Sequence, residues 1–127
     1  MTAMDLLPTF GNLAGAKVPV DRVIDGKDVW SVMAGEAKSP HKNLFYHRLT
    51  NLEAIRSGEW KLHVRDGKPE TLYNLTEDIG KKNNVLADNR DVARQLMKEI
   101  AAFEKGISEN SRPAAFVDNP KKLSIQE

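Results

Sequence analysis

The chain has 127 residues, 40% of them hydrophobic, which fits one packed domain and excludes a disordered or fibrous chain. Its 19 Lys and Arg residues nearly balance 18 Asp and Glu residues, so the net charge of +1 favours neither nucleic acid nor an anionic membrane as a partner. No apolar run reaches the roughly 18 residues of a membrane span. Cysteine is absent, which excludes disulfides, thiolate metal sites and cysteine nucleophiles.

The first predicted element is an amphipathic helix within residues 4–16. Its apolar side chains recur at helical spacing and include Leu6, Leu7, Phe10 and Leu13. The carboxylate of Asp5 is expected to cap the start of this helix, a simpler role than metal binding, and Gly15 to end the helix. Since the chain has only just begun, the apolar stripe has no evident core to face.

Residues 17–42 predict a connector that runs over a surface. Pro19, Asp25-Gly26, Gly35 and Ser39-Pro40 are turn or breaker signals, and they leave room only for a short apolar piece at residues 29–33.

Residues 43–75 predict an antiparallel sheet of short strands joined by small polar turns. The strands are expected at residues 43–48, 52–57, 59–65 and 71–75. Trp60, Leu62 and Val64 alternate with charged or polar residues, so one face of that strand should be buried and the other wet. Asp66-Gly67 suits the tight turn of a hairpin.

A second helix is predicted from about Asn89 to Lys105, with Gly106 as its end. Its apolar stripe, formed by Val92, Leu96, Ile100 and Phe103, should lie across the buried face of the sheet. The residues after Gly106 predict an extended strap or a disordered tail. The fold class is therefore α+β, with a four-stranded antiparallel sheet packed against a long C-terminal helix.

Six pieces of sequence, in order, carry a family resemblance. They are MDLLPTFGNLAGA, P-x-D-R-x-I-D-G (residues 19–26), G-x-x-x-S-P (residues 35–40), LFY (residues 44–46), LEAIRSGEWKLH (residues 52–63) and LYNLTEDIGKKNNV (residues 72–85). Together they resemble the C-terminal part of an arylsulfatase of the formylglycine-dependent sulfatase family, within the alkaline-phosphatase-like superfamily.

The resemblance implies a division of the chain. Residues 1–42 would be the end of the large α/β catalytic domain, a helix plus connector. Residues 43–106 would be the small C-terminal α+β subdomain, and residues 107–127 the strap or tail.

The resemblance also implies where the chemistry lies. The family's nucleophile is a formylglycine made from a Cys/Ser-x-Pro-x-Arg motif, and calcium neutralises the sulfate. Ser111-Arg112-Pro113 continues to Ala115 where the motif requires Arg. We therefore assign no catalytic residue, no metal ligand and no cofactor to this chain, and expect it to be inactive alone.

Three residues are candidates for substrate contact at the rim of the family's active-site cleft. His47 and Arg48 are the first choice, because a cation there would attract a sulfate ester, and Arg56 is a weaker one. Plain surface charge is the alternative for each. His41, His47 and His63 lack the spacing of metal ligands and are expected to be solvated.

The predicted function is that of a non-catalytic C-terminal part of a sulfatase, whose parent activity is sulfuric ester hydrolysis. Its partner would be the missing catalytic domain or a second copy, with the stripe of Leu6, Leu7, Phe10 and Leu13 as the interface. The alternatives are a stand-alone interaction or oligomerisation module and the complementing subunit of a split sulfatase. The sequence does not fix the compartment, although the family is commonly periplasmic, secreted or lysosomal.

Overall fold

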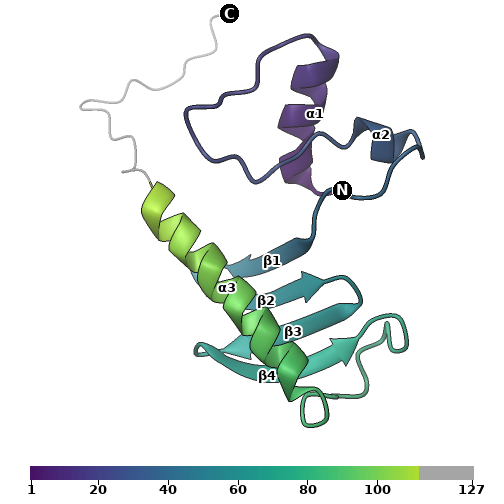
Figure 1. Ribbon diagram of the computed structural model, residues 1–127, viewed down its shortest axis with the longest axis vertical. Helices are drawn as coiled ribbons and strands as arrows, with labels where there is room; N and C mark the ends of the chain where they lie inside the picture. Colours follow the sequence, from purple (N-terminus) through teal and green to yellow (C-terminus); the bar gives the residue numbers. More distant parts are fainter. Residues whose placement is uncertain (112–127) are drawn as a thin grey trace, which may run out of the picture.

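A four-stranded antiparallel sheet crossed by one long helix forms the larger part of the structure (Figure 1). The computed structural model describes residues 1–111, so the predicted strap lies outside the described residues from residue 112 onward. Within residues 1–111, no helix is both long and apolar enough to cross a membrane.

The sheet is a simple meander whose strands pair in chain order. The strands are β1 (Asn43–Arg48), β2 (Asn51–Ser57), β3 (Trp60–Arg65) and β4 (Lys68–Asn74). The hairpin between β3 and β4 turns at Asp66 and Gly67, whose φ angles are 50° and 71°, as the Asp-Gly sequence predicts. The expected strands are thus confirmed, with ends shifted by up to three residues.

One cross-strand row forms the centre of the core. Phe45 pairs with Ile55, Ile55 with Leu62, and Leu62 with Leu72. Ile55, Leu62 and Leu72 are fully buried. Because side chains alternate along a strand, this row selects the face of the sheet that must be covered.

Helix α3 (Arg90–Asn110) covers that face. Leu96 and Ile100 of its apolar stripe are buried in the same cluster, and the Phe103 ring stacks on the Phe45 ring at 3.8 Å between centroids. The predicted packing of the helix on the sheet, and with it the α+β fold class, is confirmed.

The end of α3 differs from the prediction. The helix runs through Gly106 to Asn110 instead of stopping at Gly106. Gly106 does not adopt the positive φ that ends a helix, and its carbonyl accepts a hydrogen bond from the Asn110 side chain at 2.8 Å. A glycine inside a helix costs about 1 kcal/mol, which the packing of α3 outweighs here.

The N-terminal region forms a separate layer beyond β1, the edge strand of the sheet (Figure 1). It contains the short helix η1 (Ala3–Asp5), α1 (Leu6–Leu13) and α2 (Trp30–Met33). Gly15 ends α1 with a φ of 68°, as expected. Glu99 of α3 holds the end of the connector at the start of β1, because its carboxylate accepts from Lys42 at 2.8 Å and from Asn43 at 3.0 Å.

We predict that Leu62→Ala lowers the free energy of unfolding by about 2–5 kcal/mol, because it leaves a cavity in the central core row. Urea denaturation measures this, with Ile79→Ala as the control at a side chain that is 79% exposed. Equal losses in the two variants would contradict the assigned core.

Candidate functional site

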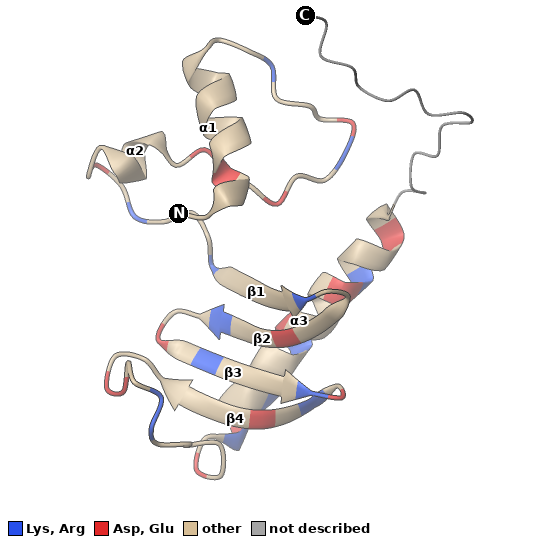
Figure 2. Cartoon of the chain, turned by 180° about the vertical axis from the view of Figure 1, so that it is seen from behind, with Lys and Arg blue, Asp and Glu red and all other residues tan. Residues whose placement is uncertain are grey.

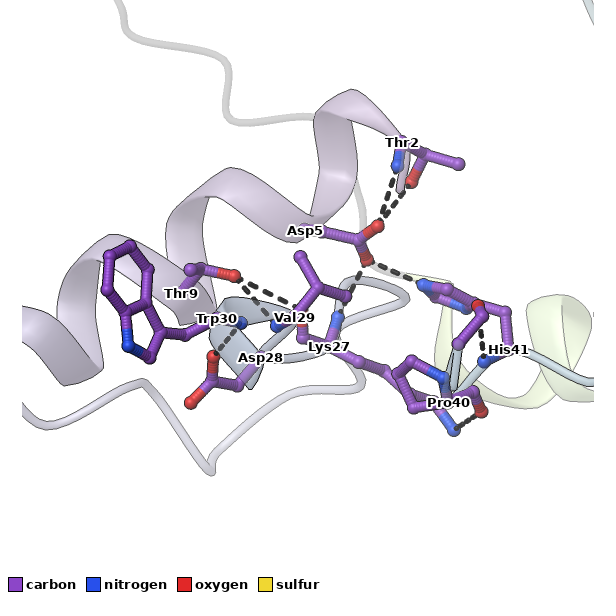
Figure 3. A network of polar contacts seen from close by, with 10 residues as sticks. Thr2, Asp5, Thr9, Lys27, Asp28, Val29, Trp30, Pro40 and His41 are labelled. Carbon is purple, nitrogen blue, oxygen red and sulfur yellow. Dashed lines mark hydrogen bonds and ion pairs between the residues drawn. The ribbon is translucent and has the colours of Figure 1, made fainter. Parts of the chain in front are cut away.

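Helix α1 turns its polar side toward the rest of the described chain. Asp5, Thr9 and Asn12 recur at i, i+4 and i+7, so they lie on one face of the helix. Each of them bonds to the connector at residues 27–29 (Figure 3 shows the contacts of Asp5 and Thr9). The connector thus packs against a polar stripe instead of an apolar one.

The carboxylate of Asp5 is the centre of this contact. It is fully buried and accepts four hydrogen bonds. Oδ1 accepts from the Lys27 backbone N–H at 3.0 Å and from His41 Nε2 at 2.6 Å. Oδ2 accepts from the Thr2 backbone N–H at 2.7 Å and from the Thr2 hydroxyl at 3.2 Å. One side chain therefore joins the chain start, the middle of the connector and the end of the connector, two residues before β1.

The pKa of Asp5 reflects opposing effects. Burial alone would raise this pKa, since it disfavours the charged carboxylate. The backbone N–H groups of Lys27 and Thr2, together with the side chains of His41 and Thr2, outweigh burial and lower the pKa well below its ordinary value. The carboxylate is thus ionised at neutral pH and acts as an acceptor only.

Thr9 and Asn12 extend the contact along the helix. The buried Thr9 hydroxyl accepts from the Val29 backbone N–H at 3.0 Å. Asn12 donates to Asp28 at 2.7 Å, and Asp28 also accepts from the Trp30 N–H at 2.9 Å at the start of α2. These bonds fix the connector over about two turns of α1.

Gly26 allows the connector to approach this closely. A Cβ atom at this position would clash with the Met4 carbonyl group. The sequence identified Asp25-Gly26 as a turn, and the structure adds a packing reason for the glycine.

One expectation is met in a different way at this site and another is wrong. Asp5 does not cap α1 itself; its carboxylate completes a capping box with Thr2 at the start of η1 and also bonds to Lys27 and His41. His41 is not solvated, since only 8% of its side chain is exposed. The helical spacing of Asp5, Thr9 and Asn12 is the sequence signal for a polar stripe. That residues 27–29 of the connector pack against this stripe depends on the tertiary structure and cannot be inferred from the spacing.

The opposite side of α1 is apolar and open to solvent. Leu6, Leu7, Phe10 and Leu13 are 39%, 59%, 53% and 51% exposed. We call these four side chains the apolar face of α1. Among the described residues nothing covers this face, which is the inverse of an ordinary surface helix.

The candidate rim residues do not form one cluster. His47 is exposed on the α3 side of the sheet, with its ring 5.8 Å from the Phe103 ring. Arg48 lines a hollow of about 670 Å³ that also contains Glu53 and Glu104. Arg56 lies on the other face and donates to the Gly58 carbonyl at 3.4 Å.

His63 lies on the same face as Arg56. It is expected from the sequence to be solvated, but it is half-buried. Desolvation, followed by the charges of Lys61 and Lys81, lowers the pKa of His63.

The described residues do not fit the calcium and formylglycine that the resemblance implies for the intact family. Among residues 1–111, no group of three or more His, Cys, Asp or Glu side chains is arranged to hold a metal ion. We therefore derive no catalytic step for this chain.

Known sulfatases are similar to the chain over most of its length, although no family model matches it. An arylsulfatase from Hemicentrotus pulcherrimus is 40% identical over 51% of this chain and 12% of that protein. A steryl-sulfatase from Mus musculus is 29% identical over 94% of this chain and 24% of that protein. The solved structure of Ps i-CgsB in complex with k-i-k-neocarrahexaose has a TM-score of 0.68 and 31% identity, over 94% of this chain and 27% of that one.

These similarities place the chain in the sulfatase family, where it corresponds to the C-terminal part. The chain spans about a quarter or less of the length of the relatives it matches.

We predict that Asp5→Ala destabilises the N-terminal layer by about 2–4 kcal/mol, because the nearly buried His41 ring and the partly buried bonds from the Thr2 and Lys27 N–H groups lose their acceptor. Amide hydrogen exchange of α1 and residues 27–33 measures this. Asp25→Ala, which removes an exposed carboxylate from the same connector, is the control and should leave the exchange unchanged. Similar exchange in the two variants would refute the role of Asp5.

Low pH should reduce the stability of the N-terminal layer. A carboxylate whose folded pKa is lowered adds stability that is present above its unfolded pKa of about 4 and is lost as the pH falls toward the folded value. We expect protection of the α1 amides, corrected for intrinsic exchange, to fall below about pH 4. Asp5→Asn should remove part of this dependence and leave the part due to Asp28, whose pKa is lowered by bonds from Asn12 and Trp30. An unchanged acid dependence in the variant would contradict this assignment.

Proposed function

We propose that this chain is a non-catalytic part of a sulfatase that supports sulfuric ester hydrolysis by packing against the catalytic domain. The catalytic domain would supply the nucleophile, the calcium ligands and most contacts to the substrate. The chain would contribute a structural surface and a segment of the rim of the substrate cleft.

The observation that carries this proposal is the inverted placement of α1. Its polar stripe is held by the connector, so its apolar face points away from the described core. Transfer of such side chains out of water contributes about 25 cal/mol per Å² of apolar area, or several kcal/mol for four large residues. A face of this kind on a small protein marks a contact with another protein surface.

The rim role is proposed for His47 and Arg48, which are exposed at the same end of β1. Arg56, on the other face of the sheet, would contact a different surface. A cation at a cleft rim would attract a sulfate ester before it reaches the catalytic centre.

The activity test compares the chain alone with the chain plus the sulfatase catalytic domain. With 4-nitrophenyl sulfate and calcium, the purified chain should release no 4-nitrophenol above a heat-killed control. Addition of the chain should raise the activity of the separately produced catalytic domain. Hydrolysis by the chain alone, or no effect on the catalytic domain, would reject the proposal.

Self-association is a second proposed function, favoured by the same exposed apolar face. A second copy would bury this face in the absence of the catalytic domain. Light scattering should then show a dimer or larger species that Phe10→Asp converts to a monomer, whereas Ile79→Asp, at an exposed side chain of the loop after β4, should have no effect. A monomeric wild-type chain would rule out self-association.

A further inference from the structure

The sheet face that α3 leaves open carries an unusual set of side chains, which we call the open face. Two cross-strand rows make it up: Leu44, Arg56, Lys61 and Tyr73 in one, and Tyr46, Ala54, His63 and Thr71 in the other. Figure 2 shows this side, with basic segments of β2 and β3 lying next to each other. The rows alternate with the core row, so they point away from α3.

Like charges oppose each other in the middle of this face. Arg56 and Lys61 are direct cross-strand partners, an arrangement that destabilises an antiparallel pair. Lys81 adds a third cation close enough to affect both Lys61 and His63. Desolvation, followed by the charges of Lys81 and Arg56, lowers the pKa of Lys61. The charge pairing of Arg56 with Lys61 therefore costs the isolated chain stability, which the contact of Lys61 with the Tyr46 ring offsets in part.

The three cations form no ion pair within residues 1–111. Arg56 donates to a backbone carbonyl, and the Lys61 ammonium lies 4.6 Å from the centre of the Tyr46 ring. Elsewhere in the described chain, cations do meet carboxylates, as Arg65 meets Glu70 at 2.9 Å and Lys42 meets Glu99 at 2.8 Å. A cluster of like charges that lacks carboxylate partners within residues 1–111 favours a partner that supplies them.

The shape and composition of the open face favour a protein partner over a small ligand. Ala54 at its centre is only 2% exposed, Tyr46 is 40% exposed, and Tyr73 flanks the cations on the far strand. The 670 Å³ hollow beside Arg48 reaches His63 but neither Arg56 nor Lys61. Small ligands occupy concave sites, whereas exposed Tyr and Arg side chains are enriched at protein interfaces.

We infer that the open face docks against an acidic protein surface, with carboxylates of the partner opposite Arg56, Lys61 and Lys81. This inference rests on the proposed function, and it places that acidic surface on the sulfatase catalytic domain. Docking would neutralise the cross-strand repulsion that the isolated chain retains. The chain would then contact the catalytic domain through two separate surfaces, the apolar face of α1 and the open face.

The test measures binding of the full 127-residue chain to the separately produced catalytic domain by isothermal titration calorimetry. Lys61→Glu should weaken binding at least tenfold, and the affinity of the wild-type chain should fall as salt is added. Lys98→Glu makes the same charge change on an exposed position of α3, on the covered side of the sheet, and should bind like wild type. Lys61→Glu can pair with Arg56, so its urea midpoint should be no lower than that of the wild type, which separates lost binding from lost folding.

The outcomes separate the two proposals. No binding by the wild-type chain would reject the proposed function and this inference together. Wild-type binding that Lys61→Glu and Lys98→Glu leave equally strong would reject only the acidic docking surface. Self-association that depends on Lys61 would assign the open face to a second copy and would also overturn the inference.

Discussion

The Asp5 carboxylate is the interaction on which the arrangement of the N-terminal layer depends. It joins three segments that are far apart in sequence: the chain start at Thr2, the connector at Lys27 and the residue at the entrance to the sheet, His41. Burying this carboxylate without its hydrogen-bond donors would lower the stability of the fold. The three segments must therefore pack around Asp5 cooperatively. The rotation of α1 about its own axis follows from this requirement.

That rotation decides what the molecule offers to a partner. Because the polar stripe of α1 must face the connector, Leu7 and Phe10 must face outward. The sheet shows a comparable division, since the row through Leu62 is covered by α3 while the row through Lys61 is not. Both surfaces are unusual for a small domain. Large apolar side chains of a helix are ordinarily buried, and like charges on neighbouring strands are ordinarily avoided or paired with opposite charges. Both are accounted for if the chain is one part of a larger sulfatase.

The sequence predicts the sheet and α3 well because their signals are local. Alternation in β3, the Asp-Gly turn and the stripe through Leu96 and Ile100 each require only neighbouring residues. Local signals give the wrong answer at two residues. Gly106 is expected to end α3, but the packing of α3 outweighs the low helix propensity of glycine. His41 is expected to be solvated, but it is buried against Asp5, which lies 36 positions earlier in the sequence. The apolar stripe of α1 is evident from the sequence as a stripe without a core, whereas the role of its polar stripe depends on the approach of the connector. The rim roles of His47, Arg48 and Arg56 remain predictions, and the structure places Arg56 on the opposite face of the sheet from His47.

Hydroxyl-radical footprinting of the chain, free and bound to the sulfatase catalytic domain, tests the central claim most directly. Met4 and Phe10 lie at the exposed side of the N-terminal layer and should be labelled readily in the free chain. The account predicts that both become protected in the complex, while labelling of the exposed Ile79 does not change. A catalytically active complex in which Phe10 is labelled as in the free chain would contradict the claim that the apolar face of α1 meets the catalytic domain.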